Sequence, residues 1–250
     1  MTLTVPKVLV GLVAASALVA GCAYNEVLGR NQFLLVDNAS LTQQADQAWA
    51  DALRTQQVSR DANANARVRR VGGRIVQAAG LTNLNWDYAV FVDSSPNAFV
   101  LPSGKVGVTT GLLALVQNDD QLAAVLGHEV GHVVAQHAAE RYSSTAVTSI
   151  GLQAIQGASG DYGQAVGALG GLGAQLGVLL PFSRQHELEA DQLGIDYMVR
   201  AGYRPTEALT LWRLMAAQRQ TQTPEFASTH PSDASRIQAI ERYIQSKGYS

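Results

Sequence analysis

The chain has 250 residues, 47% of them hydrophobic, with 18 basic and 20 acidic side chains for a formal net charge of −2. This length and composition suit one domain with a good core, and mild acidity without a basic patch, GxGxxG motif or P-loop argues against a nucleic-acid partner. The single cysteine, Cys22, excludes an intramolecular disulfide, so the core alone must stabilise the fold.

The N-terminus has the pattern of a bacterial lipoprotein signal peptide. Residues 8–20 form an apolar run that is too short to span a bilayer but suits a signal-peptide core. Val-Ala-Gly-Cys at 19–22 resembles a lipobox, which predicts removal of residues 1–21 and acylation of Cys22. Ala23 after the cysteine resembles an outer-membrane sorting signal, so we expect a lipid anchor on the periplasmic face of the outer membrane. An uncleaved anchor or an ordinary signal peptide is the alternative.

The rest of the chain predicts a polar tether and one domain. The tether covers 22–40 and the domain 41–250. Periodicity and turn residues predict a small sheet packed on helices, hence an α+β fold. The expected elements are helices at 41–57 and 62–79, a strand around 86–92, a hairpin over 97–109, a helix from about 118 to 141, and helices at 185–201, 205–220 and 232–247.

His128-Glu129-Val130-Gly131-His132 in the expected helix from 118 fits the HExxH pattern. Positions i and i+4 of a helix share a face, so the two imidazoles can bind one metal ion. Glu129 lies beside that face, where it can take a proton from a metal-bound water. The alternative is a core helix with two incidental histidines.

His137 does not fit the same site. It lies nine residues after His128, about 180° around a continuous helix, so we expect a polar or packing residue on the opposite face. The spacing also departs from the metzincin pattern, which has Gly and His where this chain has Ala135 and Ala138. The third metal ligand must therefore come from elsewhere.

The segment 182–191 is the best source of that ligand. It follows a proline and predicts a helix that carries Glu187 and Asp191 one turn apart. A carboxylate suits Zn²⁺ as a third ligand, and a second one can accept a hydrogen bond from a ligand histidine. His186 and Glu189 are competing ligands that the spacing does not exclude.

Residues 143–183 contain nine glycines and a single charged residue, Asp161. We expect helices and a loop that pack near the active site and touch the membrane. A transmembrane helix and a mobile lid over the cleft are the alternatives.

Four motifs in order resemble one known family. HEVGH followed by SRQHELEAD at 183–191 resembles the HtpX-like and CAAX-prenyl-protease-related zinc peptidases, peptidase family M48. The segment 97–113, with Ser103 where the family often has glycine, and Thr-His-Pro at 229–231, with Arg236 and Ile237 following, resemble two further motifs of the family. The resemblance covers roughly residues 41–244.

The resemblance implies a zincin-like (gluzincin) metallopeptidase domain, mostly helical with a small mixed sheet. It implies one Zn²⁺ per chain on His128, His132 and Glu187, with Asp191 in the outer shell. Glu129 would then be the general base of peptide hydrolysis.

Two further assignments concern the substrate. We expect His230 to stabilise the oxyanion or to act as a fourth ligand that closes the zinc site; a loop histidine that caps the following helix is the alternative. An extended substrate is expected to add a strand beside Asn97, Ala98 and Phe99. That mode contacts the backbone, so the predicted substrates are unfolded or misassembled envelope proteins. A catalytically quiet lipoprotein scaffold or chaperone that binds envelope proteins in the same groove is the rival, although a binding module has no need of Glu129.

Overall fold

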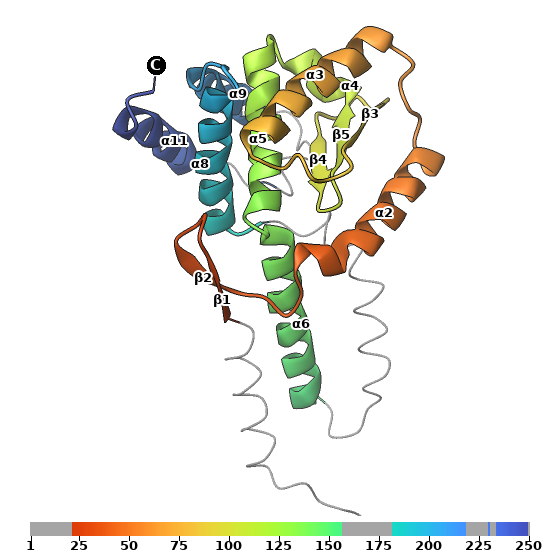
Figure 1. Cartoon of the computed structure of the whole chain (residues 1–250), viewed down its shortest axis with the longest axis vertical. Helices are drawn as coiled ribbons and strands as arrows, with labels where there is room; N and C mark the ends of the chain where they lie inside the picture. Colours follow the sequence, from red (N-terminus) through yellow and green to blue (C-terminus); the bar gives the residue numbers. More distant parts are fainter. Residues whose placement is uncertain (1–21, 157–181, 219–229, 231–233, 250) are drawn as a thin grey trace, which may run out of the picture.

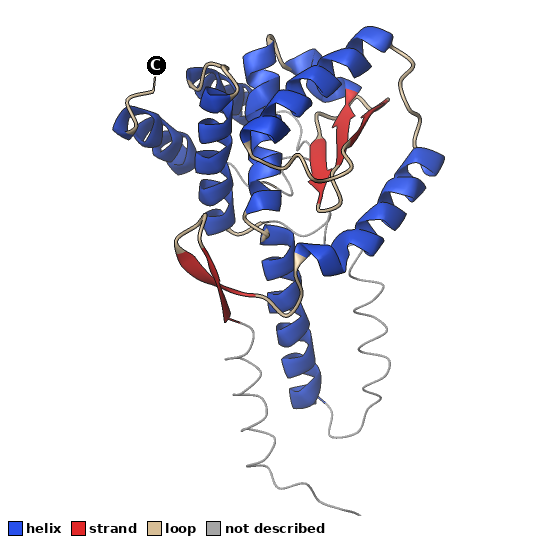
Figure 2. Cartoon of the chain, in the orientation of Figure 1, coloured by secondary structure: helices blue, strands red, loops and turns tan. Residues whose placement is uncertain are grey.

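The computed structural model describes residues 22–156, 182–218, 230 and 234–249. Helices dominate, beside a three-stranded sheet and a separate two-stranded hairpin (Figure 2). This confirms the predicted α+β, mostly helical fold class. The elements in chain order are β1 (Cys22–Asn25), β2 (Arg30–Phe33), α2 (Asn38–Thr55), α3 (Ala62–Ala78), β3 (Asp87–Phe91), β4 (Ala98–Leu101), β5 (Lys105–Thr109), α4 (Thr110–Leu115), α5 (Asp119–Val134), α6 (His137–Gln156), α8 (Arg184–Arg200), α9 (Thr206–Gln218) and α11 (Ala234–Ser246).

The sheet is mixed, as predicted, and has the order β3-β5-β4. β5 pairs in parallel with β3 and antiparallel with β4. The tight β4–β5 connection places Gly104 at φ 83°, a conformation that glycine adopts without steric cost. β4 is thus an edge strand of the sheet formed by the described residues.

The alternation of side chains along the strands divides the core into two parts. Val90, Val106 and Val108 face α3 and α5 in the main core, whereas Phe91 on the opposite face packs against Trp49 of α2 in a smaller cluster. Figure 1 shows the resulting layers, with α5 between the sheet and the C-terminal helices α8, α9 and α11. Helix α5 is consequently buried on all sides from Gln121 to Val133.

Helix α5 ends earlier than predicted. The sequence favours one helix to about residue 141, but α5 stops at Val134 and α6 starts at His137. Between them Gln136 adopts φ 54°. Two carbonyls at this break accept hydrogen bonds from side chains distant in sequence: Val133 O from Asn38 Nδ2 at 2.9 Å, and Ala135 O from Gln32 Nε2 at 2.7 Å. Tertiary hydrogen bonds thus stabilise a break that local propensity does not indicate.

The expected tether at 22–40 contains ordered structure instead. β1 and β2 form an antiparallel hairpin, and α2 already begins at Asn38 behind an Asp37 N-cap. Gln32 of the hairpin is 1% exposed. The hairpin lies below α8 and beside the start of α6, which extends beyond it (Figure 1). Polar residues form a tether when water satisfies their hydrogen bonds. Here Gln32 and Asn38 instead bond to residues of α5, α6 and the turn between them.

The other expected helices and strands begin and end within three residues of their predicted bounds. Helix α4 was not predicted. The predicted signal peptide, residues 1–21, lies outside the described residues. So does 157–181, most of the glycine-rich segment, of which α6 covers only the beginning. Of the helices that the structure describes, none is both long and apolar enough to cross a membrane.

Candidate metal centre

Helix α5 presents the HExxH residues inside the protein. Asn118 caps its first turn by accepting a hydrogen bond from the Gln121 backbone N–H at 2.9 Å. Two acidic residues of the first turn, Asp119 and Asp120, complement the helix dipole. His128 and His132, one turn apart further along, are 1% and 5% exposed, so both imidazoles are removed from bulk water.

Helix α8 brings a carboxylate to these imidazoles. Ser183 caps α8, and Glu187 follows in its first turn. The helix lies unusually close to α5, because a Cβ on Gly131 would lie 2.8 Å from the carbonyl oxygen of Ala190, and one on Gly127 would lie 2.9 Å from that of Gly194. Only glycine permits this distance, so the two α5 glycines allow the two helices with the candidate ligands to meet.

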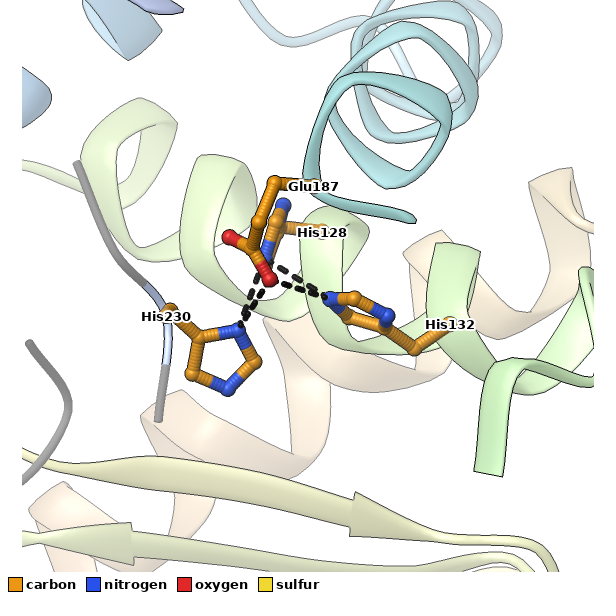
Figure 3. A group of neighbouring side chains, drawn as sticks. All are labelled: His128, His132, Glu187 and His230. Atoms are coloured by element: carbon orange, nitrogen blue, oxygen red, sulfur yellow. Dashed lines mark hydrogen bonds and ion pairs between the residues drawn. The ribbon is translucent and has the colours of Figure 1, made fainter. Parts of the chain in front are cut away.

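Four side chains converge on one point (Figure 3). Nε2 of His128 lies 3.0 Å from Nε2 of His132 and 3.2 Å from Nδ1 of His230. Oε1 of Glu187 lies 3.1 Å from His230 Nδ1 and 3.4 Å from His132 Nε2. All four residues are buried, and their ligand atoms lie within 4.8 Å of one another.

This arrangement fits a zinc ion. Ligands at about 2.0–2.1 Å in a tetrahedron lie about 3.4 Å apart, close to the separations between these donor atoms. Asp191 accepts a hydrogen bond from Nδ1 of His128 at 2.9 Å, which leaves Nε2 of that ring with its lone pair directed at the other donors. Donor atoms that face one another in a buried site must be satisfied by protons or by a bound cation, and two imidazoles with a carboxylate are donors that suit Zn²⁺.

Arg236 neutralises the carboxylates behind this cluster. Its guanidinium lies 2.5 Å from Oε2 of Glu187 and donates two hydrogen bonds to Asp191, at 2.6 and 2.8 Å, while its other face covers the Trp212 ring at 3.9 Å. Burial would raise the pKa of both carboxyls, but the Arg236 charge and the histidines outweigh it and lower both pKa values. Burial and Arg236 lower the pKa of His128, but Glu187 and Asp191 reverse this and raise it to about 9. The cluster therefore attracts positive charge.

Glu129 lies next to the cluster but outside it. The side chain is 4% exposed, and its Oε1 has no hydrogen-bond partner among the described residues. Nε2 of His230 lies 3.5 Å from this oxygen. Burial raises the pKa of Glu129 above the usual value for glutamate. A buried carboxylate with an open lone pair can act as a proton acceptor.

The competing ligands of the sequence analysis lie elsewhere. His186 and Glu189 belong to a neighbouring group, where His186 Nε2 lies 3.2 Å from Glu140 and Glu189 lies 2.9 Å from His137. The sequence predicted His137 on the opposite face of the helix, and this prediction is wrong. The break after α5 turns His137 back, so its Nδ1 lies 2.9 Å from Nδ1 of His132.

The remaining predicted site residues are distributed as follows. Hydrogen bonds in both directions between Asn97 and Thr109 precede the edge strand β4: the Thr109 N–H donates to the Asn97 carbonyl at 3.0 Å, and the Asn97 N–H donates to Oγ1 of Thr109 at 2.9 Å. Ala98 is buried, and the half-buried ring of Phe99 packs over Gly107 on the face of the sheet. β4 lies against α5. Cys22 is exposed at the start of β1.

Two residues of the centre had no role in the sequence analysis. Arg236 stood there only as part of the C-terminal motif, although two adjacent buried carboxylates require a cation nearby. Phe182 stacks on the His132 ring with a centroid distance of 3.9 Å, and the Arg141 guanidinium lies 3.8 Å from the Phe182 ring. No sequence signal indicates which aromatic side chain covers this imidazole.

The model of Peptidase family M48 matches residues 62–244. The chain belongs to this metallopeptidase family, which confirms the resemblance of its motifs. The mitochondrial metalloendopeptidase OMA1 of Schizosaccharomyces pombe is 44% identical over 179 residues, which cover 71% of this chain and 52% of the relative.

Two Escherichia coli proteins are also similar. The metalloprotease LoiP is 29% identical over 167 residues, 65% of this chain and 64% of LoiP. The beta-barrel assembly-enhancing protease is 30% identical over 179 residues, 68% of this chain and 37% of that protease. The chain spans about half the length of the yeast OMA1 relatives that it matches.

Proposed function

We propose that the protein is a zinc-dependent endopeptidase in which His128, His132 and Glu187 hold one Zn²⁺ and Asp191 orients His128. The observation that carries the proposal is the buried convergence of these three donors beside Glu129. When bound, the ion would polarise the scissile carbonyl and acidify water in the site.

Glu129 is the proposed general base. Its open Oε1 accepts the proton of the attacking water, and the resulting carboxylic acid delivers it to the leaving amine. The raised pKa of Glu129 makes the carboxylate a stronger base than an exposed glutamate. Such a proton transfer contributes about 10²–10⁴-fold to the rate.

For His230, the distances favour the fourth-ligand role over that of an oxyanion donor. Its Nδ1 is as close to His128 and Glu187 as the other donors are to one another. Four protein donors make a closed site, whereas catalytic zinc sites keep one position for water or substrate. We therefore propose a resting state that His230 closes and a working state in which it has moved away.

The sheet edge formed by β4 is the proposed substrate site. Asn97, Ala98 and Phe99 form the start of that edge, and β4 lies against the helix that carries Glu129. Because Ala98 is buried and the Phe99 ring packs over the face of the sheet, the substrate would meet the backbone of this strand. Backbone pairing supports loose sequence specificity and a preference for unfolded chains.

The location in a bacterial envelope rests on the N-terminus alone. The peptidase region is similar to mitochondrial metalloendopeptidases as well as to E. coli proteases, so it does not distinguish a bacterial envelope from a mitochondrial location. The lipobox predicts acylation of Cys22, which is exposed at the start of the hairpin. Exposed apolar side chains of the same end, Tyr24, Val27 and Leu35, suit a membrane surface. Membrane fractionation of Cys22→Ser tests this: the variant should leave the membrane fraction that retains the wild type.

The activity is tested by Glu129→Gln. The variant should retain stoichiometric zinc but lose casein cleavage by about 10²–10⁴-fold, whereas Glu241→Gln on α11 should cleave like the wild type. Unchanged cleavage by Glu129→Gln would reject the mechanism. A wild-type protein that holds zinc but cleaves no unfolded substrate would instead support the scaffold function.

A further inference from the structure

The two histidines of α5 have different partners behind the metal centre. Nδ1 of His128 faces a carboxylate, Asp191, at 2.9 Å. Nδ1 of His132 faces another imidazole, Nδ1 of His137, also at 2.9 Å. An imidazole can either donate or accept through a given nitrogen, so this second contact fixes His132 only if something fixes His137.

Glu189 supplies that constraint. Its Oε2 lies 2.9 Å from Nε2 of His137. A carboxylate can only accept, so Nε2 of His137 carries the proton and Nδ1 of the same ring carries the lone pair. That lone pair accepts the hydrogen bond from Nδ1 of His132, which leaves Nε2 of His132 free to bind metal. The His137 side chain is fully buried, so water does not compete for these positions.

Arg30 of the N-terminal hairpin holds the carboxylate in turn. Its guanidinium donates to both oxygens of Glu189, at 2.6 and 2.8 Å, and to both oxygens of Glu140, at 2.8 and 2.9 Å. Gln32 from the same strand donates to Glu140 and to the carbonyl of Ala135, in the turn that returns the chain to His137. The hairpin is therefore connected through hydrogen bonds to His132.

We propose that His137 is a positioning residue that fixes the tautomer and orientation of His132. Through Arg30 and Glu189, the N-terminal hairpin holds His137 in place and so contributes to metal affinity. This inference rests on the proposed zinc site. Outer-shell partners of ligand histidines typically contribute 10–100-fold to metal affinity.

A second metal ion in the same region would be a rival explanation. His137, Glu140 and His186 have donor atoms close enough to share an ion. However, the Arg30 guanidinium already engages both oxygens of Glu140. A fixed cation bonded to the carboxylate of this group opposes a metal ion there, so we assign His137 to the first site, where it contacts His132.

Two substitutions of His137 separate positioning from packing. His137→Leu removes the acceptor for His132, and the zinc dissociation constant, measured by competition with a chelator, should rise 10–100-fold. In His137→Asn the amide oxygen can take the position of Nδ1, so affinity should return to within about fivefold of the wild type. Unchanged affinity in His137→Leu would overturn the proposal, and so would equal losses in both variants.

The role of the hairpin needs its own variant. Arg30→Ala should weaken zinc binding by about tenfold, whereas Arg67→Ala, which breaks a similarly exposed ion pair between α3 and Asp119, should leave it unchanged. Equal affinities of the Arg30 and Arg67 variants would exclude the hairpin from the site. If His137→Leu does not fold, Glu189→Leu replaces it, because that variant removes the acceptor for Nε2 of His137. Wild-type zinc affinity in Glu189→Leu would contradict the proposed role of His137. Wild-type protein without zinc binding or cleavage would instead contradict the proposed function itself.

Discussion

Arg236 illustrates at the residue scale how the candidate metal centre tolerates buried charge. Two carboxylates, Glu187 and Asp191, are 1% and 4% exposed, and one guanidinium contacts both. Uncompensated charges at such depth are strongly unfavourable. The arginine therefore allows one carboxylate to face the ligand cluster and the other to face His128 in their ionised forms.

Arg236→Met should destabilise the zinc-free protein by about 3–5 kcal/mol, because it leaves two buried carboxylates without their cation. Urea unfolding followed by circular dichroism measures the loss. Arg213→Met on the exposed face of α9 is the control, expected within about 0.5 kcal/mol of the wild type. A loss below about 1 kcal/mol for Arg236→Met would mean that the carboxylates are neutral or otherwise compensated.

His230→Ala distinguishes the two proposed roles of this residue. If His230 closes the site at rest, the variant should cleave casein faster than the wild type and bind zinc less tightly, because one of four donors is lost. A rate decrease of 10²–10³-fold with unchanged zinc affinity would instead identify it as an oxyanion donor. Steady-state cleavage and chelator competition give both quantities.

At the element scale, the position of the metal centre depends on the close contact of α5 and α8. The contact puts the backbone of Ala190 and Gly194 where side chains at Gly131 and Gly127 would otherwise lie. Each α5 glycine weakens an isolated helix by about 1 kcal/mol relative to alanine. The tertiary contact explains why the helix has glycine there.

Gly131→Ala should therefore be harmful although alanine is the better helix former. The new methyl would lie 2.8 Å from the backbone carbonyl oxygen of Ala190. Helix α8 must therefore shift, which lowers the free energy of unfolding by about 1–3 kcal/mol. Glu187 moves with this helix. Thermal unfolding and zinc affinity should both decrease. Gly73→Ala in α3 has open space at its Cβ and should raise stability by about 0.5–1 kcal/mol. The same response in both variants would contradict the close-contact argument.

At the scale of the whole molecule, the hairpin, α6 and α8 are held together by ionised carboxylates. Burial would raise the pKa of Glu189, but hydrogen bonds from His137 and Arg30 lower it to about 2. The pKa of Glu140 is lowered by His186, Arg30 and Gln32 against the effect of burial. Because the unfolded chain binds these protons more readily, the stabilisation is complete well above about pH 4.5 and decreases as the pH falls toward 2.

The wild type should accordingly be more stable than Arg30→Ala at pH 6, and the difference in melting temperature should shrink as the pH falls to 3. Zinc-free protein is used, so that loss of the metal does not contribute. Arg204→Ala, whose side chain is 61% exposed in its pairing with Asp120, should show a small difference at every pH. A difference between wild type and Arg30→Ala that does not depend on pH would show that the stabilisation is not electrostatic.

The sequence by itself indicated His128, Glu129 and His132 as candidates, because spacing on a helix fixes which side chains share a face, and the resemblance to a known family added Glu187 and Asp191. Local periodicity and caps also predicted a small sheet and most helix bounds, while the mixed order of the strands was implied by the family resemblance. Four features are set by the tertiary structure alone. The chain breaks after Val134 and brings His137 against His132, and the Arg236 guanidinium lies between two carboxylates. His230 lies within 3.2 Å of His128, and the N-terminal hairpin is bonded to α6 and α8 through Arg30. Each of these features depends on hydrogen bonds or ion pairs between residues far apart in the chain, and a local sequence pattern does not show which distant residues will pair.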